Sequence, residues 1–139
     1  MTLPESAKEL IRSGALGHLV TLNADGSPQV ACVWVKVEGD ELLTAHLSTR
    51  QRKLQNVRRD PRVALSFEGT KMHLPGMREQ IVVHGKAELE EGGAPELLQE
   101  LAYTYVAPDV KFPPMDDPPP GVRLRITVER VGGIGPWAD

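Results

Sequence analysis

The sequence has very little cysteine and few aromatic residues, and it contains no long apolar run. Its single cysteine, Cys32, excludes an intramolecular disulfide bond and is typical of a reducing compartment. No segment approaches the roughly 20 apolar residues that a membrane-spanning helix needs. The N-terminus also lacks the basic-then-apolar order of a signal peptide. We therefore expect a cytoplasmic protein without a membrane partner, folded as one domain over residues 1–139.

Two further absences exclude other classes of function. The four histidines have no metal-ligand spacing, so we expect no metal site. The net charge of −3 does not provide the broad basic face of a nucleic-acid-binding protein. Yet six of the 16 Lys and Arg residues fall between Arg50 and Arg62. An acidic protein with one concentrated basic segment indicates a local anion site rather than a nucleic-acid partner.

What the sequence does contain is a succession of short β-type segments joined by turn residues. Alternating or β-branched apolar residues predict six strands, at residues 17–22, 30–37, 41–47, 62–68, 80–89 and 122–131. Turn formers such as residues 23–28 (NADGSP) and 38–40 (EGD) make the first three strands an antiparallel meander. Six strands with little helix predict a closed or nearly closed barrel, since closure removes edge strands.

Helices and two irregular segments complete the prediction. Apolar periodicity predicts helices at residues 4–13 and 94–105, and a basic helix within residues 48–61. Residues 107–120, the Pro-rich segment, hold six of the 12 prolines, but their apolar side chains predict an ordered extended segment. Residues 69–79 are long for a hairpin loop, and such loops often carry function.

The basic helix is the segment with the clearest chemistry. It follows a strand directly, and the unpaired N–H groups of its first turn favour an anion. Arg50, Arg52 and Lys53 add positive charge at that turn. Asn56 is four residues from Arg52 and three from Lys53, so these side chains can converge on one ligand. The spacing predicts a phosphate site, against the alternative of a solvated helix with a basic outer face.

Several parts of the sequence together resemble a known family. Residues 17–22 (GHLVTL) and 25–30 (DGSPQV) are similar to the opening of the pyridoxamine-phosphate-oxidase-like, flavin/deazaflavin split-barrel superfamily. Residues 52–65 resemble its phosphate-binding strand-helix-strand segment, and the order of elements also matches. Residues 75–78 (PGMR) and 126–137 (ITVERVGGIGPW) resemble the actinobacterial F420-dependent branch. The resemblance implies a mainly β fold with a few helices, a six-stranded antiparallel split β-barrel.

The same resemblance implies a homodimer that holds a phosphorylated flavin-type cofactor in a groove between the subunits. The cofactor would be coenzyme F420 or, alternatively, FMN. The residues implied to bind its phosphate are Arg52, Lys53 and Asn56. The residues implied to line the turn are Ser48, Thr49, Arg50 and Gln51. The ring system would lie along Val33 and Trp34, and the partner subunit would close the site with Met77, Arg78 and Trp137.

The implied function is that of an F420-dependent reductase, which transfers a hydride between reduced F420 and a small conjugated organic substrate. Since the cofactor performs the chemistry, we expect no catalytic nucleophile in the protein. The alternatives are an FMN-dependent pyridoxamine-phosphate-oxidase-like enzyme and a non-catalytic F420- or flavin-binding carrier. The sequence departs from the FMN-using oxidases because it has only six aromatic residues and no second phosphate site, which favours F420.

Overall fold

The computed structural model describes residues 1–138, so the last residue of the predicted domain, Asp139, lies outside the described part. In chain order the elements are α1 (Glu5–Arg12), β1 (Gly17–Leu22), β2 (Pro28–Val33), β3 (Lys36–Glu38), β4 (Glu41–His46), α2 (Arg52–Arg59), β5 (Arg62–Leu74), β6 (Met77–Glu91), α3 (Ala94–Tyr105), β7 (Val122–Ile134) and the 3₁₀ helix η1 (Pro136–Ala138). None of these helices is long and apolar enough to cross a membrane.

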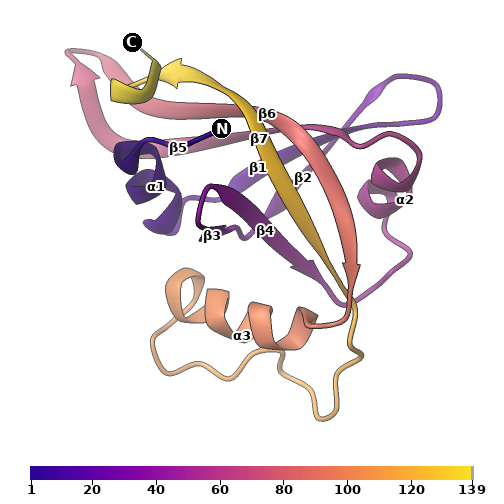
Figure 1. Ribbon diagram of the computed structural model, residues 1–139. Coiled ribbons are helices and arrows are strands. Elements are labelled where there is room, and N and C mark those ends of the chain that lie inside the picture. The colour runs from indigo at the N-terminus through magenta and orange to yellow at the C-terminus, as the bar shows by residue number, and fades with distance from the viewer. Residues whose placement is uncertain (139) are drawn as a thin grey trace.

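The strands of the described chain form one antiparallel sheet with the order β2-β1-β5-β6-β7-β4-β3. The long strands β5, β6 and β7 lie at its centre, and the sheet is strongly curved (Figure 1). β2 and β3 stand at the two ends of this order, yet only Trp34 and Val35 separate them in sequence. The sheet therefore curls until its two edges are joined by the chain, which gives the split β-barrel that the resemblance implied.

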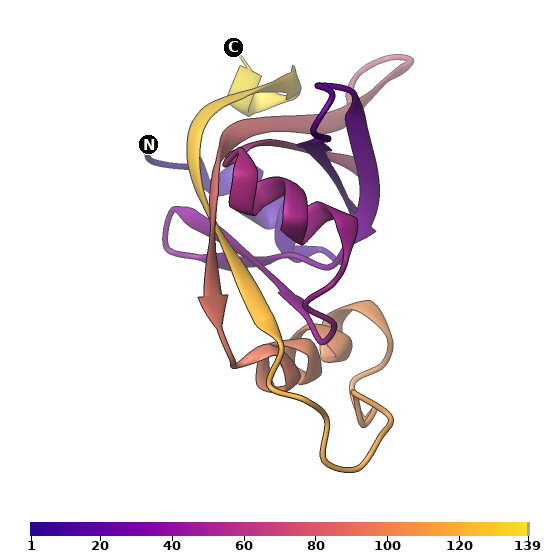
Figure 2. The ribbon, with the colours of Figure 1, turned by 90° about the vertical axis from the view of Figure 1, so that its right-hand side faces the viewer.

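Apolar side chains fill the barrel because strand residues alternate between its inside and its outside. The inner cluster contains Leu19 and Phe67 from the strands, and it is closed by Ile11 of α1 and Leu54 of α2. α3 lies outside the barrel, where Leu101 belongs to a second, smaller cluster against β4. Figure 2 looks onto α2, with α3 and the Pro-rich segment below it. The start of α2 lies close to the place where α3 packs against the barrel.

The prediction of one continuous strand at residues 30–37 is wrong, because the structure divides these residues into β2 and β3 at Trp34 and Val35. The Val35 N–H donates to the Tyr105 hydroxyl at 3.1 Å instead of to a neighbouring strand. That hydroxyl donates in turn to the carbonyl of Ala15 at 2.9 Å. Tyr105 lies 70 residues further along the chain, so the local apolar pattern could not reveal the break. The described chain therefore has seven strands where six were predicted.

The predicted loop at residues 69–79 is also wrong, because these residues extend the hairpin of β5 and β6. Leu74 pairs with Met77, so the turn consists of only two residues. One of them, Gly76, has φ of +80°, a conformation that glycine adopts without strain. Apolar side chains near the tip of this hairpin, among them that of Met72, are exposed to solvent.

Two other segments lie near their expected places. α3 has the bounds predicted for it, and α1 is one residue shorter at each end than residues 4–13. The Pro-rich segment forms neither helix nor strand and runs beside α3 (Figures 1 and 2). It is fastened there by Gln99, whose side-chain amide bonds to the backbone at Val110 and Phe112.

Candidate functional site

The basic helix α2 begins without a side-chain cap. Its N-cap residue, Gln51, makes no capping hydrogen bond, and the hydroxyl of Ser48 accepts the N–H of Arg50 at 3.3 Å. Within residues 1–138 the N–H groups of Arg52 and Lys53 have no hydrogen-bond partner. The first turn also contains no acidic residue. Two free donors at the positive end of a helix dipole favour an anion.

The six cations of the basic segment fall into two groups. Three bind other groups of this chain, through backbone carbonyls or an ion pair with Asp60: Arg58, Arg59 and Arg62. The other three have no carboxylate within 4.0 Å in the described part of the chain: Arg50, Arg52 and Lys53. The unpaired cations are those nearest the uncapped start of α2, so free positive charge and free N–H donors coincide there.

A cavity of about 190 Å³ lies beside Lys53, and we call it the Lys53 cavity. Its lining comes from the end of β2, from β4, from α2, from α3 and from the Pro-rich segment: Cys32, Val33, Trp34, Ala45, His46, Lys53, Leu98 and Phe112. The structure thus brings together Val33, Trp34 and Lys53, three of the residues expected to bind the cofactor. Most of the other lining residues are apolar, so the cavity combines a cation with walls that suit a ring.

Burial perturbs the pKa values of two side chains that line this cavity, His46 and Lys53. Burial lowers the pKa of Lys53. Burial and, secondarily, the positive charge of Lys53 lower the pKa of His46 to about 3. The Nε2 atom of His46 lies 2.8 Å from the Oγ1 atom of Thr44, and this hydrogen bond holds the ring. At neutral pH the cavity therefore presents a neutral imidazole beside one ammonium group.

Asn56 does not line the cavity, although its spacing suggested a phosphate contact. It is 1% exposed, and its Nδ2 donates to Thr21 and to Asn23, both at 3.0 Å. Its Oδ1 accepts from Arg59 at 3.1 Å. These bonds use both ends of the amide, so Asn56 fastens α2 to β1 and the turn that follows it. The expected convergence of Asn56 with Lys53 on one ligand is not present in this structure.

The remaining predicted residues also lie outside the cavity on this chain. Exposed residues of the connection and of the first helical position are Ser48, Thr49, Arg50, Gln51 and Arg52. Met77 and Arg78 are exposed near the hairpin tip, while Trp137 is buried and its Nε1–H donates to the carbonyl of Gln80 at 3.2 Å. α2 and the C-terminal end lie on different sides of the molecule (Figure 1). A contribution of these three residues to the cavity requires a second subunit and stays a prediction.

Five of the lining residues were not predicted from the sequence as site residues, and His46 and Phe112 are the two with the most distinctive side chains. His46 ends β4, and only its burial beside Lys53 distinguishes it from the other histidines. Phe112 lies in the Pro-rich segment, whose composition gives no sign of where it packs. The signal available for Phe112 was its place among the few aromatic residues of the sequence.

The pyridoxamine 5'-phosphate oxidase family matches residues 3–135, which is nearly the whole chain. The chain belongs to the pyridoxamine 5'-phosphate oxidase family. As a family member it has a flavin-binding split-barrel fold, and the family points to an oxidoreductase. No curated protein was found to match the chain.

Three solved structures show the extent of the likeness to other split-barrel proteins. An F420 reductase is 24% identical, with a TM-score of 0.75, over 94% of this chain and 98% of the other. A conserved hypothetical protein from Mycobacterium tuberculosis is 22% identical, with a TM-score of 0.71, over 99% and 86%. General Stress Protein 26 from Bacillus anthracis is 20% identical, with a TM-score of 0.66, over 94% and 92%. At these identities the likeness shows the fold alone.

Proposed function

We propose that the protein is an F420-dependent reductase, with the cofactor phosphate at the start of α2 and the deazaflavin ring in the Lys53 cavity. Bound F420 would supply the hydride, and a small conjugated organic molecule would accept it. The residues of this chain bind and orient the cofactor and exclude water from its ring. The observation that carries the proposal is the partly buried Lys53 ammonium, which has no anionic partner among residues 1–138.

An unpaired, partly buried cation opposes folding unless a ligand compensates it, because burial removes water from the charge. A phosphate group supplies what is missing, since it carries negative charge and several strong acceptor oxygens. Lys53 can pair with that charge, and the free N–H groups of Arg52 and Lys53 can donate to its oxygens. Val33 and Trp34 offer apolar walls for a planar ring. The residues present therefore fit both parts of the cofactor.

One chain supplies only part of such a site. A volume of about 190 Å³ is below the roughly 300–1,000 Å³ that is typical of small-molecule sites. The proposal therefore includes a homodimer in which a second subunit completes the Lys53 cavity. Met77, Arg78 and Trp137 of that subunit are the candidates for closing it.

The outer face of β2, β1, β5 and β6 offers the surface for this subunit contact. A row of paired residues, Val30, Val20, Ala64 and His84, crosses the four strands. None of the described helices covers this face, because α1 and α2 pack into the inner cluster and α3 against β4. Val30, at the edge of the row, is 58% exposed. An uncovered sheet face that carries a row of apolar side chains is typical of a subunit interface.

The test is a titration of the purified protein with F420 and with FMN, followed by cofactor fluorescence. F420 should bind with a Kd below about 100 μM, the range of a specific small-molecule complex. Arg52→Ala and Lys53→Ala should each weaken binding about tenfold or more, because a charge-assisted hydrogen bond contributes about 1.5–3 kcal/mol. Arg62→Ala is the matched control, since Arg62 already pairs with Asp60 at 2.7 Å and should bind no ligand.

Two outcomes would contradict the proposal. Failure of both cofactors to bind would remove the reductase and its FMN-dependent alternative together. Unchanged F420 affinity in Lys53→Ala would place the phosphate somewhere other than the start of α2.

The second candidate is an FMN-dependent enzyme, favoured by the match to a flavin-binding family. Such a protein would be purified yellow and would bind FMN more tightly than F420. A non-catalytic carrier would bind F420 equally well, so turnover with a panel of conjugated acceptors separates the carrier from the reductase.

A further inference from the structure

Phe112 lines the Lys53 cavity although it comes from the Pro-rich segment, outside the barrel. Its ring centroid lies 5.1 Å from that of Trp34, with the two planes inclined by 54°. Trp34 is also stacked on Tyr105 of α3, with centroids 5.4 Å apart and planes inclined by 8°. The Tyr105 hydroxyl in turn accepts the N–H of Val35. Two aromatic neighbours thus fix the Trp34 indole, and Phe112 is the one that borders the cavity.

Gln99 of α3 determines where Phe112 lies. Its Nε2 donates to the carbonyl of Val110 at 2.9 Å, and its Oε1 accepts the N–H of Phe112 at 2.9 Å. One side-chain amide therefore satisfies two backbone groups of a segment that has no strand partner. Proline-rich backbone has few conformations to lose on ordering, so two hydrogen bonds fix it more effectively than they would fix a flexible loop.

We propose that Phe112 is a specificity-determining residue of the Lys53 cavity and that Gln99 is its positioning residue. The ligand class is a planar conjugated ring that carries an anionic group. The aromatic walls of Trp34 and Phe112 contact a flat ring over its full area but a puckered ring over only part of it. Lys53 selects the negative charge on the same ligand.

The inference takes from the proposed function only the placing of an anion at Lys53. Within that function the ring belongs either to the cofactor or to the hydride acceptor, which share this chemistry. Failure of F420 and FMN to bind would end the proposed function but not this inference, because the cavity can be tested with a simple probe.

The probe is 2-naphthoate, a flat bicyclic carboxylate, and the readout is the indole N–H signal of Trp34 in nitrogen-15 NMR. The chain has two tryptophans, and only Trp34 lines the cavity of its own chain, so the two indole signals are assigned and followed separately. Addition of 2-naphthoate should shift the Trp34 signal with a Kd of about 1 mM or tighter, as its small size allows. Cyclohexanecarboxylate, which has the same charge and a puckered ring, should bind at least about threefold more weakly.

Single substitutions test whether Phe112 contacts the ligand or only supports the fold. Phe112→Ala should weaken 2-naphthoate binding about three- to tenfold, the effect of one aromatic contact. Gln99→Ala should weaken it by a smaller factor, and Gln99→Glu, which keeps the acceptor for the Phe112 N–H, should restore part of the loss. The matched controls are Met115→Ala in the same segment and Tyr103→Ala on the same helix, both exposed, and both should bind like the wild type.

The inference is overturned if Phe112→Ala and Met115→Ala bind 2-naphthoate equally well, or if the puckered acid binds as tightly as the flat one. A shift of Trp137 without a shift of Trp34 would also overturn it. Titration of Phe112→Ala with F420 then identifies the natural ring. Weaker F420 binding assigns Phe112 to the cofactor ring, and an increased KM for the acceptor at unchanged F420 affinity assigns it to the substrate. No change in either quantity contradicts the inference.

Discussion

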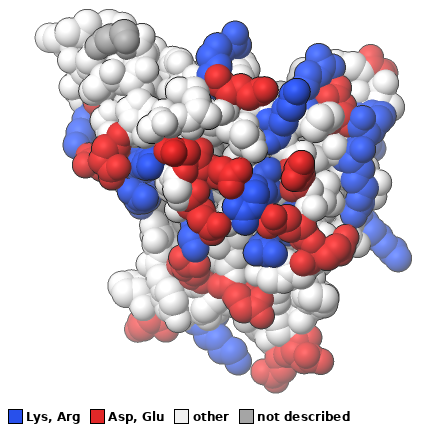
Figure 3. All heavy atoms as spheres, in the orientation of Figure 1, with Lys and Arg blue, Asp and Glu red and all other residues white. Residues whose placement is uncertain are grey.

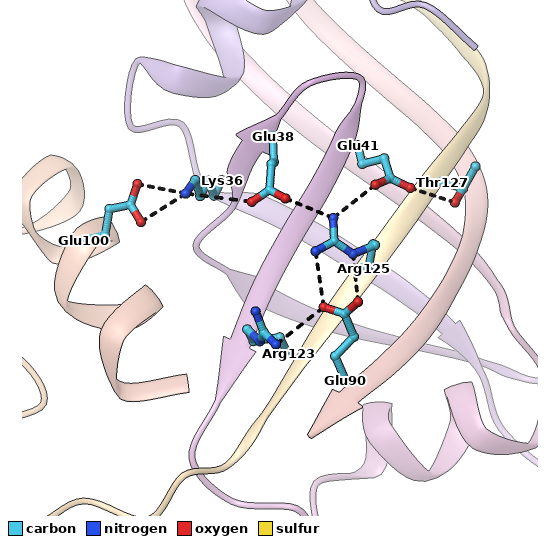
Figure 4. Close-up of polar contacts among 8 residues, drawn as sticks. All are labelled: Lys36, Glu38, Glu41, Glu90, Glu100, Arg123, Arg125 and Thr127. Carbon is cyan, nitrogen blue, oxygen red and sulfur yellow. Dashed lines mark hydrogen bonds and ion pairs between the residues drawn. The ribbon is translucent and has the colours of Figure 1, made fainter. Parts of the chain in front are cut away.

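Arg125 and Lys53 are both cations beside the sheet, but their surroundings differ completely. Arg125 of β7 pairs with Glu90 at 2.9 Å, Glu41 at 3.0 Å and Glu38 at 3.2 Å (Figure 4). Hydrogen bonds to Glu90 and Glu41 raise the pKa of its guanidinium further. Lys53 has no carboxylate partner in the described chain, and burial lowers the pKa of its ammonium group. One cation is neutralised by the protein itself, and the other is not.

The same contrast distinguishes two regions of the molecule. On the outer face of β3, β4, β6 and β7, acidic and basic side chains are intermixed (Figure 3). Lys36 there pairs with Glu100 and Glu38, and Arg123 pairs with Glu90. This network leaves little charge for a ligand, whereas the start of α2 has cations without an ion pair and N–H donors without a hydrogen bond within residues 1–138. A cluster of positive charge is therefore a better candidate for a binding site where the protein provides no counter-ion of its own.

A carboxylate placed beside Lys53 should give it the internal counter-ion that Arg125 already has. Cys32 lines the same cavity, and Cys32→Asp places an acid there. F420 affinity should fall about a hundredfold, because the new carboxylate pairs with Lys53 and repels the phosphate. Cys32→Ser, which is similar in size and uncharged, is the control, and fluorescence titration measures both. Full affinity in the Asp variant would show that Lys53 does not bind the cofactor.

The imidazole beside Lys53 should make stability depend on pH. The pKa of His46 is lowered to about 3, whereas in the unfolded chain it titrates near 6.5. Its contribution to stability is therefore fully present above pH 6.5 and is lost as the pH falls toward 3. At pH 5 the free energy of unfolding should be reduced by about 2 kcal/mol for this reason. Urea denaturation at pH 7.5 and pH 5 should show this loss in the wild type and not in His46→Gln; equal losses would contradict the assignment.

The neutralised cation should matter for stability and not for binding. Arg125→Met leaves three carboxylates facing one another and should lower the free energy of unfolding by about 1–2 kcal/mol, limited by solvent screening. Lys86→Met is the control, because its ion pair with Glu129 is exposed and 4.0 Å long, and it should change stability little. Chemical denaturation measures both variants. A loss of F420 affinity in Arg125→Met would remove the distinction between the two regions.

The local parts of the fold could be predicted from the sequence because the signals for them are local. Apolar periodicity located α3, and turn residues located the β1–β2 hairpin. The division of residues 30–37 depends on Tyr105, which reaches Val35 only in the folded protein. The hairpin extension at residues 69–79 was missed because its residues lack an apolar alternation, although they continue the pairing of β5 and β6.

The candidate site was predictable to the same extent. Lys53 could be predicted because its charge and its place in the first turn of the basic helix both follow from the sequence alone. Asn56 has the right spacing but faces β1, since a helix of two turns presents neighbouring residues to different surroundings. His46 and Phe112 join the cavity only through tertiary packing, so no spacing within one segment could have indicated them.

The place where the chain crosses from β2 to β3 has a consequence for dynamics. Trp34 and Val35 join the two edges of the sheet, and Trp34 also belongs to the wall of the Lys53 cavity. The junction between β2 and β3 therefore borders the proposed binding site. A ligand held between Lys53 and Trp34 would stabilise the junction between β2 and β3, so that local opening there requires release of the ligand. Amide hydrogen exchange at Val35 should slow as ligand saturates the protein, so occupancy of the site could be read from the closure of the barrel.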